Sequence, residues 1–163
     1  MTSRQDDELM VSAVGTRRRL QALAVAGWPL ARIARETGET PGALALALTP
    51  TAATVTVGTA RAVAAFYTRY QLASPGLHGV SHVHARQARE KATRAGWAPH
   101  GVWDDDTIDD PAARPEWTGH CGTTRGADLH ERHNIPLCPP CKAALHRRQL
   151  RNAARERRAL TRA

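Results

Sequence analysis

The sequence predicts a mainly α-helical protein with an N-terminal helix-turn-helix bundle, a central helix, and a small C-terminal cysteine/histidine module followed by a basic helix. Three observations lead to this prediction. Apolar residues recur at helical spacing through residues 16–73, and glycine or proline separates the segments. Aromatic residues make up only 4% of the chain, so alanine and leucine must supply a core of small helices. All three cysteines follow position 120.

The first half of the chain is expected to contain four helices after a polar lead-in over residues 1–15. Each helix has a capping residue or a proline near its start and apolar residues on one face. Thr16 is the expected N-cap of the first helix, Gly27 ends it, and Trp28 packs into the core. A loop or short extended segment is expected at residues 51–57. The four expected helices cover residues 17–26, 29–37, 41–48 and 59–72.

The second and third of these helices fit a helix-turn-helix motif. Ala34 is small where the two helices cross, and Gly38 tolerates the positive φ of a tight turn. Helix 41–48 would then read DNA bases, although Thr40 at its start offers the main hydrogen-bonding side chain. The alternative is a motif that serves only for packing or dimerisation. Phosphate contacts are expected from arginines of this region, namely Arg17, Arg18, Arg32, Arg35 and Arg61.

These patterns divide the chain into a helix-turn-helix domain at 16–73, a helix plus acidic linker at 74–116, and the cysteine/histidine module with its Arg-rich helix at 117–163. In the second region, a helix over 82–95 is expected to end at Gly96. Five aspartates follow between Asp104 and Asp110 and are expected to form a solvated loop, because they lack the spacing of a calcium-binding loop. Docking of this acidic stretch on the basic tail is the alternative.

The cysteines suit a structural zinc site better than disulfide bonds. An odd number of cysteines cannot close a disulfide framework, whereas Cys138-x-x-Cys141 presents two thiolates to one ion, with Cys121 as a third ligand. Four histidines compete for the fourth position: His120, His130, His133 and His146. His120 adjoins Cys121, where sharing one ion is awkward. His133 would lie on a different helical face from His130, and His146 would have to reach back from a last helix that starts at about Lys142.

Four segments of the chain carry a resemblance to a known family. They are RRRLQALAVAGWPLARIARETGETPGALALAL, VTVGTARAVAAFYTRY, ATRAGWAPHGVWDDDTIDDPAARP and the CGT…H…CPPC module. Over residues 16–145 the chain resembles the Xre-like helix-turn-helix proteins of actinobacteria and their phages. The resemblance implies a helical fold and DNA binding. It also implies His130 as the fourth zinc ligand, because His130 matches the histidine of the module's pattern, which usually has an aromatic residue where this chain has Ala127.

The positive charge of the chain is concentrated at its C-terminal end. The formal net charge is +8, and residues 141–163 hold eight basic residues against Glu156 alone. Such a tail suits a polyanionic partner, although a solvated basic tail is the simpler interpretation. Phosphate contacts are expected from the arginines of this tail. Helical spacing places four of them on one side, namely Arg148, Arg151, Arg155 and Arg158, and Arg147 lies beside this row.

Together these features predict a non-enzymatic cytoplasmic protein that binds duplex DNA, acts as a transcriptional regulator, and contains one structural zinc ion. We expect neither a signal peptide nor a membrane span, because no stretch is long and apolar enough. A homodimer or a protein partner is a further expectation. The alternative function is a zinc-stabilised adaptor that binds a polymerase or a phage factor. An HNH-type nuclease is disfavoured, because His133-Asn134 beside the last two cysteines does not complete a catalytic site.

Overall fold

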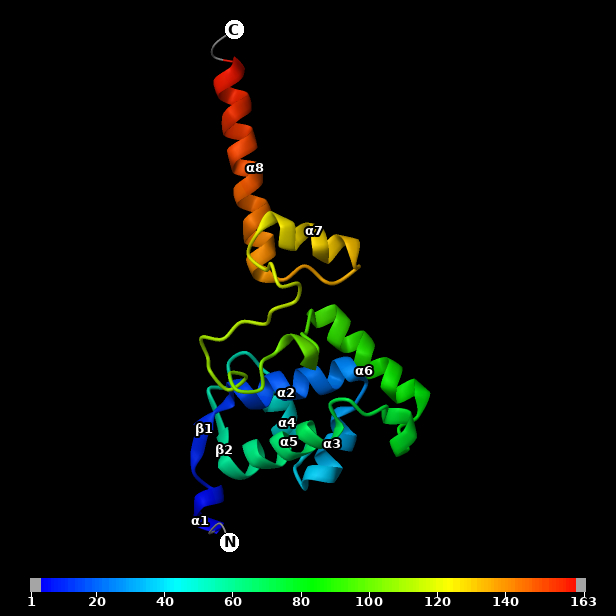
Figure 1. The fold of residues 1–163 in the computed structure, drawn as a ribbon. Coiled ribbons are helices and arrows are strands. Elements are labelled where there is room, and N and C mark those ends of the chain that lie inside the picture. The colour runs from blue at the N-terminus through cyan, green and yellow to red at the C-terminus, as the bar shows by residue number, and fades with distance from the viewer. Residues whose placement is uncertain (1–3, 161–163) are drawn as a thin grey trace. The chain divides into compact units, whose positions relative to one another are not determined.

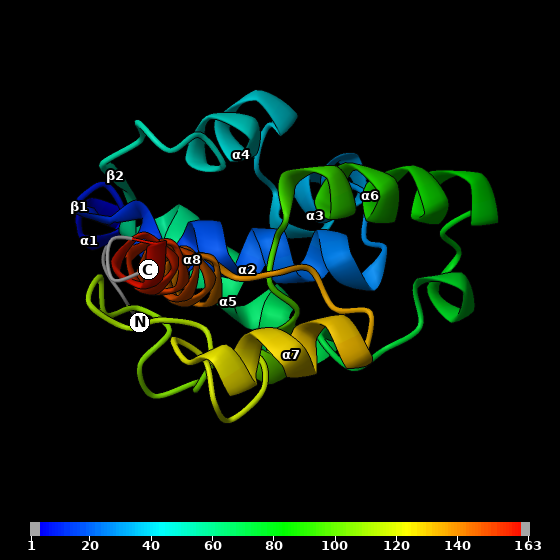
Figure 2. The same cartoon turned by 90° about the horizontal axis from the view of Figure 1, so that it is seen from above.

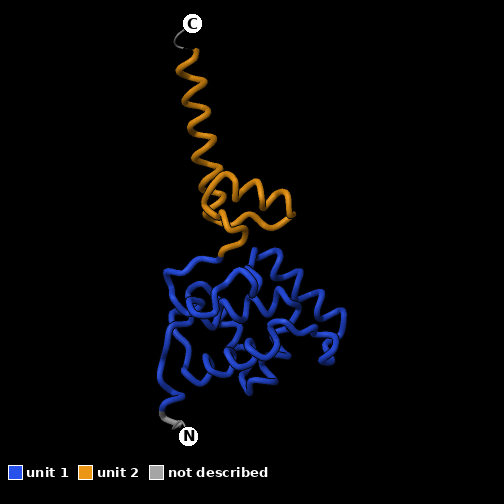
Figure 3. The backbone as a smooth tube through the Cα atoms, in the orientation of Figure 1, with its two compact units in different colours: residues 1–115 blue, residues 116–163 orange. Residues whose placement is uncertain are grey.

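The computed structural model describes residues 4–160. The chain divides into two compact units, which comprise residues 1–115 and 116–163 and are coloured separately in Figure 3. Unit 1 contains most of the secondary structure. Its elements are α1 (Arg4–Asp7), β1 (Met10–Ser12), α2 (Ala13–Ala26), α3 (Leu30–Thr37), α4 (Pro41–Ala47), β2 (Thr54–Thr56), α5 (Val57–Tyr70), α6 (His82–Ala95), and the 3-10 turns Pro75–His78 and His100–Val102. Unit 2 contains α7 (Thr124–Arg132) and α8 (Pro139–Leu160).

The core of unit 1 forms around α2, which runs through the middle of the helices in Figures 1 and 2. Leu20 and Leu23 of α2 are fully buried and belong to one core cluster with Leu44 of α4 and Val63 of α5. Trp28 follows the end of α2 and is 1% exposed. Its ring lies 5.3 Å from that of Phe66 and 5.1 Å from that of Tyr70 between centroids, so a few aromatic side chains complete a core of leucine and alanine.

The helix-turn-helix geometry is set by glycine and threonine. Gly38 ends α3 with a φ of 74°, a left-handed conformation that glycine adopts without strain. The Thr40 side chain then caps α4 by accepting a hydrogen bond from the Ala43 amide at 3.1 Å. The predicted fold class is confirmed, because the protein is mainly helical with a C-terminal Cys/His cluster and a long final helix. The expected ends of the central helix, His82 and Ala95, are also those of α6.

The expectation of a polar lead-in over residues 1–15 is wrong for residues 4–15, and residues 1–3 lie outside the described part of the chain. Met10–Ser12 pairs antiparallel with Thr54–Thr56, with Val11 opposite Val55, and α2 already begins at Ala13. The cap of α2 is Ser12, whose hydroxyl accepts from the Val14 amide at 3.3 Å, whereas the expected cap Thr16 is buried inside the helix. A three-residue strand carries too little alternation to be recognised in sequence, and its partner explains the extended segment expected at 51–57.

The acidic segment is partly anchored to the helical core of unit 1. Ile108 is fully buried, and the Asp109 carboxylate pairs with Arg19 of α2 at 2.5 Å. The hydrogen bond from Arg19 lowers the pKa of Asp109. The pair therefore stabilises the fold above the ordinary carboxyl pKa, and this contribution is lost as the pH falls through the lowered value. The Asp104, Asp105 and Asp106 side chains are exposed, as expected for a solvated loop.

Arg18 is the main link between α2 and this segment. Its guanidinium donates to the carbonyl oxygens of Ile108, Asp110 and Ala113 at 2.8, 2.6 and 2.9 Å, and lies 4.4 Å above the Trp103 ring. We expect Arg18→Ala to lower the free energy of unfolding of unit 1 by about 3 kcal/mol, because bonds from a charged donor are lost together. Urea denaturation measures this change. The exposed Arg35→Ala variant is the control, and equal stabilities of the two variants would contradict the assignment.

Candidate metal centre

Three cysteines and one histidine of unit 2 converge on one point. Cys121 precedes α7, His130 lies within α7, Cys138 precedes α8, and Cys141 lies in the first turn of α8. Cys138, Cys141 and His130 are buried, and Cys121 is half-buried. One ligand atom from each of the four side chains lies within 4.8 Å of all the others, so the cluster is close enough to bind a metal ion. These are the four residues expected from the sequence, His130 included.

Local structure explains why these side chains meet. Gly122 has a φ of 86° and turns the chain directly after Cys121. The Thr123 hydroxyl then caps α7 by accepting from the Gly126 amide at 3.0 Å. The helix α8 begins at Pro139, earlier than the expected Lys142. The two prolines of the Cys-Pro-Pro-Cys turn suit the start of a helix, because the first amides of a helix have no partner within it.

The distances within the cluster fit a tetrahedral ion. Zinc–sulfur bonds of roughly 2.3 Å and a zinc–nitrogen bond of roughly 2.0 Å place two sulfur atoms about 3.8 Å apart, and sulfur and nitrogen about 3.5 Å apart. The Cys121 sulfur lies 3.5 Å from the Cys138 sulfur and 3.6 Å from the His130 Nε2 atom. The residues present therefore fit a bound metal ion with three sulfur ligands and one nitrogen ligand.

The surroundings of the cluster favour a cation at its centre. Burial raises the pKa of the Cys138 thiol to about 12, and a metal ion supplies the charge that allows such thiols to ionise. The Gly122 amide donates to the Cys141 sulfur at 3.4 Å. In the described part of the chain, the buried Nδ1 atom of His130 has no hydrogen-bond partner. A bond from Nε2 to a metal ion would give the other nitrogen of this buried ring a partner.

The competing histidines lie outside the cluster. His133 and His146 are exposed, and His120 is half-buried in the turn before Cys121. Trp117 is the residue that sequence reasoning missed: its ring centroid lies 5.9 Å from that of His130, and its side chain packs against the buried cysteines. A tryptophan four residues before the first cysteine was the available signal. Ala127 is buried in the same cluster as Cys138 and Cys141.

Gly126 allows α7 to approach the turn that holds Cys121. A Cβ atom at this position would overlap with the backbone carbonyl of His120. We expect Gly126→Ala to destabilise unit 2 by about 2 kcal/mol and to weaken metal binding, because the turn must move away from α7. Metal titration and thermal unfolding measure both effects. Arg125→Ala at the neighbouring exposed position is the control, and two variants with the same metal affinity would refute this explanation.

Several of the expected DNA-contacting arginines of unit 1 make contacts within the protein. Arg17 donates to the carbonyl oxygens of Ala47 and Ala52, and Arg18 is bound as described above. Arg32 pairs with Glu36, and Arg61 pairs with Asp7, each at 2.9 Å. Arg35 is exposed, and Thr40 caps α4. Among the residues described, Arg35 is therefore the expected phosphate contact of unit 1 with the fewest hydrogen bonds and ion pairs within the protein.

The expected contacts of the tail lie on α8. Arg147 donates to the Gly122 carbonyl at 3.3 Å, and Arg148 lies 3.9 Å from Asp128 of α7. The side chains of Arg151, Arg155 and Arg158 are exposed. Among the helices that the structure describes, α8 therefore has the most exposed basic residues.

Comparison of the chain with protein-family models, curated proteins and solved structures gives no match. The class that the fold and site define is thus a mainly helical protein with a candidate Cys/His metal centre. Within residues 4–160, no helix is both long and apolar enough to cross a bilayer.

Proposed function

We propose that the protein binds duplex DNA through α8 and acts as a regulator of transcription, with a structural zinc ion that fixes the start of this helix. The observation that carries the proposal is the composition of α8. Its 22 residues span about 33 Å. They include seven basic residues and one acidic residue, and nearly every side chain beyond Leu145 is exposed. Figure 1 shows α8 continuing well past the turns that lie beside α7.

Four arginines of α8 share one face of the helix. Counting from Cys141 in steps of three or four residues gives Ala144, Arg148, Arg151, Arg155 and Arg158, which share one face of a helix. The face that is buried against α7 at Cys141 and Ala144 therefore continues outward as a line of arginines. A metal ion bound to Cys141 would hold this line in a fixed orientation relative to α7. Guanidinium groups in such a row match the phosphates along a DNA backbone.

Zinc is the metal that the ligand chemistry favours. Three thiolates and one imidazole are soft or borderline ligands, which suit zinc better than magnesium or calcium. Four protein ligands close a tetrahedral site and leave no position for a substrate, so the proposed role is structural. The proposed site consists of Cys121, His130, Cys138 and Cys141.

A second candidate function is a zinc-stabilised adaptor that binds another protein through α4. The exposed face of α4 carries Gly42, Ala43, Ala45 and Leu46, and Leu46 is 65% exposed. This face offers methyl groups rather than the amides and guanidinium groups that read base edges. The observation favours a protein partner for α4, while the charge on α8 favours DNA for unit 2.

The experiment that tests the proposal is fluorescence anisotropy with the zinc-loaded full chain and duplex DNA of random sequence at low salt. We expect saturable binding that weakens as salt is added, because phosphate contacts release counterions. Absence of binding at low salt would reject the DNA proposal. Recovery of a stoichiometric protein partner after nuclease treatment would then favour the adaptor.

A further inference from the structure

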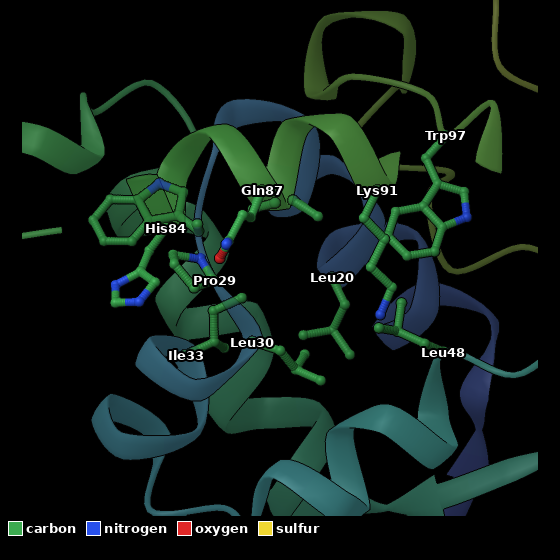
Figure 4. Close-up of a pocket in the computed structure, with 12 residues that line it drawn as sticks. Leu20, Pro29, Leu30, Ile33, Leu48, His84, Gln87, Lys91 and Trp97 are labelled. Carbon is green, nitrogen blue, oxygen red and sulfur yellow. The ribbon is translucent and has the colours of Figure 1, made fainter. Parts of the chain in front are cut away.

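A cavity of about 240 Å³ lies within unit 1, between α6 on one side and α2, α3 and Leu48, the residue after α4, on the other. Apolar side chains supply most of its wall. Figure 4 shows Leu20, Leu30, Ile33 and Leu48 on the side opposite α6. Two tryptophans, Trp28 and Trp97, also line the cavity. The site is therefore suited to a hydrocarbon group that is withdrawn from water.

The polar groups of the cavity come from α6. His84, Gln87 and Lys91 recur at helical spacing, and the side chains of Gln87 and Lys91 extend into the cavity in Figure 4. Neither Gln87 nor Lys91 has a hydrogen bond or ion pair within the described residues. The neighbouring acid, Glu90, pairs instead with Arg86 at 3.6 Å. No carboxylate is among the residues that line the cavity.

The ammonium group of Lys91 lies 5.9 Å from the centre of the Trp97 ring and has no carboxylate partner in the cavity. The combination of this cation and an apolar wall defines the ligand. We propose that this cavity binds a small amphipathic carboxylic acid. Lys91 and Gln87 would bind its carboxylate, and its hydrocarbon part would lie against Leu20, Leu30 and Leu48. Charge complementarity selects an anion, because the lining contains a cation and no acidic residue. The inference concerns unit 1 alone and does not depend on DNA binding by α8.

The size of the cavity favours a small molecule over a protein segment. Its volume is below the roughly 300–1,000 Å³ of pockets for drug-sized ligands. A helix, with a diameter of about 10–12 Å including its side chains, would not fit between α6 and α3. A bound acid would contact α2, α3 and α6 together, and it would therefore raise the thermal stability of unit 1.

Isothermal titration of the full chain with sodium octanoate tests the proposal, with sodium hexanoate and 1-octanol as comparison ligands. We expect one octanoate per chain, and each additional methylene should strengthen binding about fourfold. Lys91→Gln should weaken octanoate binding about fivefold, because one charge pair is lost. Arg94→Gln removes the same charge from α6 at an exposed position outside the cavity and should leave binding unchanged.

A cavity-filling variant makes the test independent of charge. Ala88 lines the cavity from α6, and leucine is a good helix former, so Ala88→Leu should fold and reduce octanoate binding at least tenfold. Circular dichroism confirms the fold of each variant. The proposal is overturned by any of three results: no octanoate binding at millimolar concentration, equal affinities of Lys91→Gln and Arg94→Gln, or 1-octanol binding as tightly as octanoate.

Discussion

Replacing Cys141 with serine is expected to abolish metal binding. Residues 116–160 should then lose their folded structure. The apolar core of unit 2 is small: its fully buried members are Ala127, Cys138 and Cys141, with Trp117, Leu137 and Leu145 packed at its edge. A core of this size does not offset the chain entropy that folding removes. A structural zinc ion contributes about 10 kcal/mol to small modules of this kind, so its loss should exceed the stability of the unit.

The measurement combines metal analysis of the purified chain with the dispersion of its amide NMR signals. The wild-type chain should hold one zinc ion, and Cys141→Ser should hold none. In the spectrum of this variant, the amide signals of residues 116–160 should lose their chemical-shift dispersion. Unit 1 has its own core and should keep its signals. His146→Ala is the matched control, because His146 lies on the same helix and is exposed outside the cluster. A folded, metal-loaded serine variant would show that the cluster is not the metal site.

Ending the chain at Gln149 is expected to lower the affinity for duplex DNA by at least about a hundredfold at low salt. This truncation keeps the metal ligands and the turns of α8 that contact α7, including Arg147 and Arg148. It removes Arg151, Arg155, Arg157, Arg158 and Arg162. The loss should be large because each arginine that neutralises a phosphate releases counterions, and these contributions multiply.

Anisotropy titrations of the two chains against the same duplex measure this difference. Metal content serves as the control, since the truncated chain should still bind one zinc ion. Unchanged affinity after truncation would place the DNA contacts elsewhere in the chain. Arg35 of α3 would then be the first residue to test in unit 1.

Much of the fold was predictable because residues at the ends of its helices indicate in the sequence where those helices stop. Gly38 and Gly96 follow the last residues of α3 and α6 in sequence and adopt positive φ in the structure. The metal cluster was predictable for a similar reason, because the Cys-x-x-Cys turn fixes two ligands locally. The choice of His130 rested on the resemblance to the Xre-like proteins rather than on spacing. The structure now places His130 with the cysteines.

The features that the sequence did not reveal depend on contacts between distant segments. The strand β1 exists because Val11 meets Val55, and no local pattern contains that pairing. From the sequence, Arg17 and Arg18 were expected to contact phosphates. In the structure, their guanidinium groups instead donate hydrogen bonds to carbonyl oxygens up to 95 positions away in sequence. Similarly, Lys91 and Gln87 of α6 line a cavity with residues of α2 and α3, and no local pattern within α6 indicates those neighbours.

The salt dependence of DNA affinity is the most direct test of the proposal that the arginine side of α8 binds DNA phosphates. Full-length protein should give a slope of log affinity against log salt of about −4, which corresponds to four arginines on one side of the helix. The double variant Arg151→Gln/Arg155→Gln should lower the magnitude of this slope by about 2. Arg69→Gln/Arg94→Gln, which removes the same charge from exposed positions of unit 1, should leave the slope unchanged. Equal slopes for the two double variants would show that Arg151 and Arg155 do not contact DNA phosphates.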